Sequence, residues 1–466
     1  MTYPATRELA KRIAAVKASD VGEAARAGAR NAALDTLGVI LAGRGDECAR
    51  LAHRLAVSEG GAPVARLIGA EERTSASWAA FVNGTAGHAL DYDDVDFVML
   101  GHPSVTLVPA LIALAEERGI GGARVLEAYT LGFELLHVLG RAVNPQHYRR
   151  GFHATATLGS VGVAGACAYL LGFNKVQTMH ALSLGASGSA GLVSNFGTMT
   201  KPFHAGQSAR AGLVAAKLAE GGFTAAEDTL ETGFTAAMAA EEIGPTAHEF
   251  ADWESAVAPW GPPWDIEEGV CVKIHPCCAM THPGIDAMLD LVTSEDVQVT
   301  DVAELGARAS TMTLKVLRYK EATTGLEGKF SMPFCIASAL VDRKVGIRQF
   351  EEDSVGRPEI AALQKRVAFE LDEKMAREDP ETEAAEVWIK LKDGRELTRF
   401  FARARGHVEN PLTELELREK FLECAAGLTE EKARAAWDAW YRLDAAEDVA
   451  SLTAMLAEPV REPSPV

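Results

Sequence analysis

The stretch from residue 82 to 104 holds the residues best suited to acid–base chemistry. Within fifteen positions it carries two imidazoles and four carboxylates: His88, Asp91, Asp93, Asp94, Asp96 and His102. A carboxylate beside an imidazole fixes its tautomer and raises its pKa, as general acid–base catalysis requires. If residues 85 to 92 are helical, His88 and Asp91 share one face. Residues 101 to 104 are expected to form a turn that presents His102. The alternative interpretation is a solvated acidic loop that caps helix ends.

Two further segments place a polar group beside an uncharged helix. His153 begins a buried helix, where scarce water and the helix dipole favour a neutral imidazole that is usable as a base. The alternative for His153 is a helix cap. Lys201 lies between a long uncharged segment and the next helix, a place where a purely structural lysine is uncommon. We expect Lys201 to bind a substrate carboxylate, or to act as a base if burial lowers its pKa.

Metal sites are the competing interpretation of two clusters. Residues 273 to 282 contain two cysteines and two histidines, but the adjacent Cys277 and Cys278 lack the C-x-x-C spacing of zinc sites, and no second cluster follows. An iron–sulfur cluster would need more thiolates at suitable spacing. This segment therefore predicts a loop that presents Lys273 and His282 to a cleft. The acidic cluster lacks the glycine and distal glutamate of an EF-hand, so Mg²⁺ or Ca²⁺ there is the secondary interpretation.

One type of chemistry uses these residues without a cofactor. Removal of a proton α to a carboxylate and loss of CO₂ both create negative charge on a carbon frame, which cations stabilise while imidazoles move protons. Positive charge would come from Lys201, Lys273 and, more weakly, Arg318. Proton transfer would come from His102, His153 and His282. The sequence has no P-loop, no G-x-G-x-x-G after a strand and no G-x-S-x-G elbow.

The composition of this 466-residue chain excludes some classes of binding partner and indicates a compartment. It has 46 Lys and Arg against 65 Asp and Glu, a net charge of −19, which argues against nucleic acid and anionic membranes as partners. A small anionic substrate remains compatible, because a few cations converging in a pocket outweigh the distant surface charge. Seven dispersed cysteines indicate reduced thiols, and the first residues lack the pattern of a secretory signal. We expect a cytoplasmic protein.

Hydrophobic periodicity predicts a mainly α protein. Two uncharged segments, residues 154–173 and 181–200, approach the ~20 residues of a membrane span. They are rich in Gly, Ala, Ser and Thr and lack flanking Lys/Arg asymmetry, so we expect buried helices packed through small residues. Apolar residues at helical spacing predict further helices within 5–43 (two, the second beginning near 19–20), 47–60, 105–117, 123–139 and 206–220.

The pattern changes near residue 260. Alternation predicts strands over 311–318 and 366–371, and residues 386–400 are typical of a hairpin with Asp393-Gly394 as its two-residue turn. From residue 412 the pattern is helical again. The predicted architecture is a large all-helical domain formed by both chain ends (1–265 and 406–460), a smaller inserted α+β lid domain (266–405) and a tail (461–466).

Several motifs, in order from about residue 5 to 455, resemble the MmgE/PrpD family. They are the runs from His88 to Asp94, Gly101 to Ser104, Gly151 to His153, Thr200 to Gly206, Lys273 to His282 and Glu327 to Phe334. The resemblance implies a large helical domain with a smaller α+β lid, a homodimer, and action on a small di- or tricarboxylate without metal or organic cofactor. The catalytic positions it implies are Asp91, His102, His153, Lys201 and His282. The candidates for substrate binding are Lys273, Tyr319, His204 and Arg318.

The branch of the family stays open. Val95 stands where the 2-methylcitrate dehydratase and cis-aconitate decarboxylase branches carry threonine, and the Trp-Gly-His-Pro-Ser-Asp-Asn pattern of the dehydratase is missing around His102. The first functional hypothesis is a cofactor-independent lyase that removes water or CO₂. The second is an epimerase or isomerase of an N-substituted aspartate-like dicarboxylate, as in iminodisuccinate epimerase. A non-catalytic carboxylate-binding protein and a metal-dependent hydrolase are the remaining hypotheses.

Overall fold

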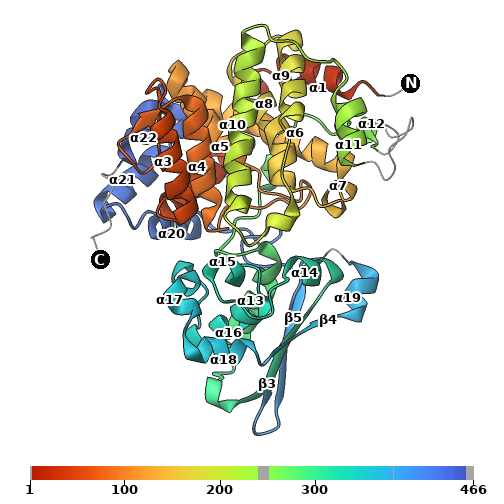
Figure 1. The fold of residues 1–466 in the computed structure, drawn as a ribbon, viewed down its shortest axis with the longest axis vertical. Helices are drawn as coiled ribbons and strands as arrows, with labels where there is room; N and C mark the ends of the chain where they lie inside the picture. Colours follow the sequence, from red (N-terminus) through yellow and green to blue (C-terminus); the bar gives the residue numbers. More distant parts are fainter. Residues whose placement is uncertain (1–2, 240–250, 381, 458–466) are drawn as a thin grey trace.

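The structure, a computed structural model, describes residues 3–239, 251–380 and 382–457, and it is mainly helical (Figure 1). The predicted tail at 461–466 lies outside these residues. One hydrophobic core joins the N-terminal helices to the C-terminal ones. The helices of this part are α1 (Ala5–Ala15), α2 (Glu23–Gly43), α3 (Glu47–Glu59), α4 (Ala76–Ala89), α5 (Ser104–Arg118), α6 (Gly122–Val143), α7 (Gln146–Arg149), α8 (Ala154–Leu170), α9 (Lys175–Ser187), α10 (Thr200–Glu220), α11 (Thr235–Met238), α12 (Trp253–Val257), α20 (Glu414–Cys424), α21 (Glu430–Trp440) and α22 (Val449–Met455).

A second hydrophobic core surrounds a four-stranded sheet with the order β4-β3-β5-β6. Its strands are β3 (Val302–Ala309), β4 (Val367–Leu371), β5 (Ala385–Leu391) and β6 (Glu396–Phe401). The pair β3–β4 is parallel, whereas β5 pairs antiparallel with both β3 and β6. Alternate residues of β5 are buried, because α13 (His282–Ser294) and α16 (Met332–Asp342) pack on one face of the sheet. Shorter helices complete this part: α14 (Thr311–Val316), α15 (Gly325–Gly328), α17 (Glu352–Val355), α18 (Pro358–Gln364) and α19 (Glu373–Glu378).

The hairpin predicted at 386–400 is confirmed as β5–β6, although its turn differs from the prediction. Leu391 and Arg395 pair across the hairpin, so the loop has three residues rather than two, and Gly394 takes the left-handed conformation at φ 92°. The strand at 366–371 is confirmed as β4. The strand predicted at 311–318 is wrong. Ser310 caps the amide of Thr313 there and begins helix α14, while the strand lies earlier, at 302–309.

Three helix predictions are corrected by backbone geometry. The helix expected over 181–200 ends at Ser187, because Gly191 and Gly197 adopt positive φ values of 159° and 80° that a helix cannot contain. Helix α10 begins at Thr200 rather than at 206, so Lys201 lies in its first turn. The second helix begins at Glu23, because residues 18–20 form a separate 3₁₀ turn instead of its N-cap.

The uncharged segment at 154–173 is confirmed as the buried helix α8. Small residues also let α4 and α10 cross closely, as Gly84 and Gly206 meet at the crossing. None of the helices in the described residues combines the length and the apolar character that crossing a membrane requires. The homodimer and the cytoplasmic location stay predictions.

The α4–α10 crossing makes a stability prediction. A Cβ atom at Gly206 would lie 2.2 Å from both the Phe81 carbonyl oxygen and the Thr85 hydroxyl. Overpacking of this kind costs about 1–3 kcal/mol, so Gly206→Ala should lower the midpoint of thermal unfolding. The control is Gly45→Ala, because no atom lies within 4 Å of its added Cβ. Equal midpoints for the two variants would contradict the close crossing.

Candidate active site

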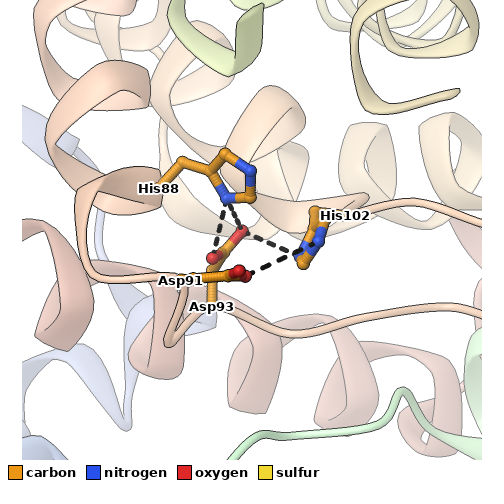
Figure 2. A group of neighbouring side chains, drawn as sticks. All are labelled: His88, Asp91, Asp93 and His102. Atoms are coloured by element: carbon orange, nitrogen blue, oxygen red, sulfur yellow. Dashed lines mark hydrogen bonds and ion pairs between the residues drawn. The ribbon is translucent and has the colours of Figure 1, made fainter. Parts of the chain in front are cut away.

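The site is organised by the turn from Leu90 to Asp94, directly after α4. Because α4 ends at Ala89 and Asp91 has φ 52°, His88 and Asp91 do not share the helical face expected from their spacing. The Asp91 carboxylate instead faces two lysines from later in the chain, Lys201 and Lys273. The chain then folds back, and the backbones of Asp96 and Gly101 exchange two hydrogen bonds. As a result His102 lies beside the turn (Figure 2).

Asp91 forms ion pairs with two buried lysines. Its Oδ2 lies 2.9 Å from Nζ of Lys201, and its Oδ1 accepts from Nζ of Lys273, which also donates to the Asp91 carbonyl at 3.0 Å. Burial alone raises the pKa of Asp91, but the two ammonium groups outweigh it and hold that pKa well below its usual range. Asp91 in turn raises the pKa of Lys273 against the effect of burial. Asp91 and Lys273 are therefore both charged at neutral pH.

His102 has a defined hydrogen-bonding direction. Its Nδ1 lies 2.7 Å from the carbonyl oxygen of Asp94 and 3.2 Å from a carboxylate oxygen of Asp93. A carbonyl oxygen only accepts, so Nδ1 carries a proton and Nε2 is the variable position. Burial lowers the pKa of His102, and the charges of Lys273 and Lys201 lower it further, against the opposing effect of Asp93. His102 is thus a neutral imidazole whose Nε2 is available as a base.

Asp93 lies between two imidazoles. Both of its carboxylate oxygens are 2.8 Å from Nδ1 of His88, and one contacts His102 on the other side (Figure 2). Burial lowers the pKa of His88 to about 3 despite this carboxylate. His88 is therefore neutral and donates to Asp93 through Nδ1. The sequence predicted Asp91 as the carboxylate beside His88. Because of the left-handed turn, Asp93 takes that position instead.

His153 and His204 form a second imidazole pair. Their Nδ1 atoms are 3.1 Å apart, so one ring donates and the other accepts. Burial and the charge of Lys201 hold the pKa of His153 well below its usual range and lower that of His204 to about 4. Of the two, His153 lines the cavity, with its ring edge-on to Phe196 at 4.9 Å.

Several of the predicted residues meet at one cavity of about 80 Å³. Its polar lining includes five predicted residues, Asp91, His102, His153, Lys201 and Lys273. Aromatic rings cover Lys201, whose Nζ lies 5.3 Å from the ring centroids of both Phe196 and Phe330. This arrangement can bind a small anion, place it beside a base, and keep water scarce around it.

Three polar residues that line the cavity were not predicted as site residues: Asp96, which belongs to the acidic cluster after His88, and two others. Tyr148 and Cys278 line it, and burial raises the pKa of both, that of Cys278 to about 12. They are therefore neutral hydrogen-bonding groups. Cys278 lies in the segment predicted to present Lys273 and His282 to a cleft, but its own thiol had been weighed only as a metal ligand. Tyr148 had no signal, because a single tyrosine in a short helix has no distinctive spacing.

Other predicted residues lie beside the cavity rather than on its wall. Nε2 of His282 is 3.3 Å from the Cys277 carbonyl oxygen, and its ring packs against His275. Arg318 donates to the Phe196 carbonyl and lies over the ring of Tyr319. None of these side chains lines the cavity in the described residues. Arg318 and Tyr319 thus contact the segment that carries Phe196.

Four side chains have a metal-like arrangement. Ligand atoms of His88, Asp91, Asp93 and His102 all lie within 4.8 Å of one another. Asp93 already contacts Nδ1 of both imidazoles, and Asp91 holds two ammonium groups. A divalent cation here would have to approach these positive charges and displace their contacts, which opposes binding. The donor set therefore fits proton transfer better than metal coordination.

The direction of the His102 shift is testable without a substrate. Because its pKa lies below the ordinary 6.5, His102 should stay neutral as pH falls past that value and become charged only at lower pH. Lys273→Met removes a positive charge that lowers this pKa, so the midpoint should rise. Ring proton and carbon chemical shifts followed by NMR against pH measure both. Lys365→Met, an exposed lysine paired with Glu321, is the control. A wild-type midpoint above 6.5 would contradict the geometry.

Comparison with known proteins identifies the family of this chain. Residues 7–244 match the MmgE/PrpD N-terminal domain, and residues 275–442 match the MmgE/PrpD C-terminal domain. The chain is 26% identical to cis-aconitate decarboxylase of Aspergillus terreus over 85% of this chain and 84% of that protein. It is also 26% identical to cis-aconitate decarboxylase of Mus musculus, over 83% and 80%, and of Homo sapiens, over 75% and 72%. The matches cover both parts of the chain in order, and the protein belongs to the MmgE/PrpD family.

Proposed function

We propose that this protein is a lyase that acts on a small di- or tricarboxylate by acid–base chemistry next to a carboxylate, without a cofactor. The observation that carries the proposal is the cavity in which two ammonium groups, Lys201 and Lys273, converge beside Nε2 of His102. Decarboxylation is the first candidate reaction, because relatives that match most of the chain are named cis-aconitate decarboxylase. Dehydration remains the second form of the same lyase chemistry.

The charge balance of the cavity supports an anionic substrate. Lys201 and Lys273 share the single carboxylate of Asp91. Asp96, which also lines the cavity, is paired at 2.9 Å with His137, whose pKa is raised to about 10 by Asp96 and Asp265 against the effect of burial. Positive charge thus remains for carboxylates of the substrate, and aromatic walls strengthen its attraction by excluding water.

His102 is the proposed proton-transfer group. A bound substrate with several negative charges raises the pKa of His102, so that Nε2 gains a proton. In decarboxylation the bond to one carboxylate breaks, CO₂ leaves without the bonding electrons, and Nε2 delivers its proton to the carbon that keeps them. The ammonium groups stabilise the charge that spreads into a remaining carboxylate. In dehydration the neutral Nε2 instead removes the proton α to a carboxylate as hydroxide leaves.

Epimerisation is the second candidate function. It needs one group to remove the α proton and another to return a proton to the opposite face. Two neutral imidazoles, His102 and His153, line the cavity and favour this alternative. The substrate would then be an N-substituted aspartate-like dicarboxylate.

Proton NMR in D₂O distinguishes these reactions. The chelator-treated protein is incubated with cis-aconitate, 2-methylcitrate, citrate and an N-substituted aspartate. We expect a new methylene signal of the decarboxylated product from cis-aconitate, or a new olefinic signal from a hydroxy acid. Deuterium incorporation without loss of CO₂ or water would instead establish the epimerase. Activity that disappears with the chelator and returns with a divalent ion would overturn the cofactor-independent proposal.

The role of His102 predicts a large kinetic effect. His102→Asn should lower kcat by about 10²–10⁴, the usual share of a general acid or base. His282→Asn is the matched comparison, since this imidazole belongs to the same family motifs but contacts Cys277 rather than the cavity. Its effect on kcat should be less than about tenfold. Steady-state kinetics measure both, and an equal loss in the two variants would refute the assignment to His102.

Lys201 is expected to act mainly in substrate binding. Lys201→Met keeps the length and apolar stem of the side chain but removes the ammonium group, so KM should rise by about tenfold or more, as expected for loss of a hydrogen bond to a charged group. Lys365→Met again serves as the control. An unchanged KM with unchanged kcat would exclude Lys201 from the site.

A further inference from the structure

Three buried lysines donate to three successive backbone carbonyls of the turn that carries Asp91. The carbonyl oxygens of Leu90, Asp91 and Tyr92 accept from Nζ of Lys329, Lys273 and Lys420, respectively. The partners are 239, 182 and 328 positions apart in sequence, so three remote segments converge on one turn. Of these three lysines, Lys273 touches the Asp91 carboxylate and lines the cavity, whereas Lys329 and Lys420 are not among the described residues that line it.

This turn depends on outside donors. Asp91 has a left-handed φ of 52°, so the chain leaves helix α4 at this point. The carbonyl groups of the turn therefore do not continue the hydrogen-bonding pattern of α4. A buried carbonyl without a partner costs free energy, and a charged donor satisfies it better than a neutral one. The ammonium groups therefore stabilise this conformation of the turn against a regular continuation of the helix.

Lys420 reaches the turn from the C-terminal helix α20. Its Nζ lies 2.6 Å from Oδ1 of Asp35 in α2 and 2.8 Å from the Tyr92 carbonyl oxygen. The same ammonium lies over the Tyr92 ring at 4.2 Å. Both Lys420 and Asp35 are buried. Among the described residues, neither Lys420 nor Asp35 lines the cavity, and Lys420 contacts the turn that carries Asp91.

Lys329 reaches the turn from the segment between α15 and α16. Its Nζ donates to Leu90 and also to the Pro276 carbonyl, at 3.2 Å, and its own carbonyl accepts from the amide of Cys278 at 3.0 Å. The next residue, Phe330, covers Lys201 in the cavity. In the described residues no carboxylate forms an ion pair with Lys329. Burial lowers its pKa to about 8. This side chain therefore ties the turn to the C-terminal part of the chain.

We propose that Lys329 and Lys420 are positioning residues, which hold the Leu90–Asp94 turn in the shape that the reaction needs. They act through the turn: it sets Asp91 between Lys201 and Lys273, and it points the Asp94 carbonyl at Nδ1 of His102. Because Lys329 comes from the C-terminal part and Lys420 from the last helices, the turn takes its active shape only when both are docked. The expected effect on kcat rests on the proposed function. The expected effect on the conformation of the turn does not depend on that function.

Hydrogen exchange followed by mass spectrometry tests the structural consequence without a substrate. The variants are Lys329→Met and the double variant Asp35→Asn/Lys420→Met, in which no buried carboxylate is left without its cation. Amides of Val95, Asp96 and His102 are hydrogen-bonded and report on the turn in peptides covering 88–104. Exchange there should accelerate by about tenfold or more, the effect of losing a hydrogen bond to a charged donor. Peptides from α8 should exchange as in the wild type.

Unchanged exchange at 88–104 in both folded variants would overturn the proposal. Lys329→Arg keeps a donor and should retain the protection that Lys329→Met loses, and equal exchange in these two variants would also overturn it. Lys365→Met is the matched control for loss of a lysine charge. Circular dichroism verifies that each variant folds. Because the two lysines are tested in separate variants, the proposal can still be refuted if one variant fails to fold.

Kinetics separate positioning from general stability. Misplacement of the turn should lower kcat by about 10²-fold in Lys329→Met, with KM within about threefold of the wild type. A purely structural lysine would lower the melting temperature and leave kcat of the folded enzyme unchanged, which would also overturn the proposal. If the wild-type protein converts none of the carboxylates, the proposed function fails, whereas the exchange measurement still decides whether the lysines hold the turn.

Discussion

The rest of the site depends on one buried charge cluster, the carboxylate of Asp91 between the ammonium groups of Lys201 and Lys273. Taking such charges out of water is costly unless each one finds close partners. Here the partners come from the turn after α4, the first turn of α10 and the loop before α13. The large helical core positions the first two, and the loop of Lys273 runs from Val272, which packs on that core, to Cys277 in the second core. The two parts lie one above the other in Figure 1. The fold thus satisfies one carboxylate with two cations and leaves positive charge in the cavity.

Beside these charges the imidazoles stay neutral, and their direction is set by backbone and carboxylate acceptors. The Asp94 carbonyl fixes the proton on Nδ1 of His102, and Asp93 is held in place by His88 on its other side. A histidine close to two ammonium groups loses affinity for its proton, so Nε2 is a base in the empty site. The carboxylate–imidazole contact inferred from spacing exists, but with Asp93 as the carboxylate.

The sequence predicted the elements with strong local signals and missed those set by distant contacts. The buried helix α8 and the β5–β6 hairpin follow from periodicity and turn chemistry. The helix α14 was missed because six residues satisfy a strand pattern as well as a helical one, and Ser310 decides between them. The motifs identified His102, Lys201 and Lys273 at the cavity. They could not show that His282 faces a carbonyl, nor that Lys420, in the helical segment after residue 412, reaches a turn 328 positions away.

Lys201 and Lys273 also connect substrate binding to the proton affinity of His102. In the empty site their charges lower the proton affinity of His102, so the imidazole starts neutral. A substrate carboxylate that pairs with Lys201 and Lys273 cancels this effect and adds negative charge beside Nε2. Under the proposed function, binding of the anion therefore converts His102 from a base into a group able to donate a proton. A decarboxylation needs a donor at the carbon that CO₂ leaves, whereas a dehydration needs the base first. Under the proposed function, the substrate charge that remains near His102 sets whether Nε2 acts first as a proton donor or as a base.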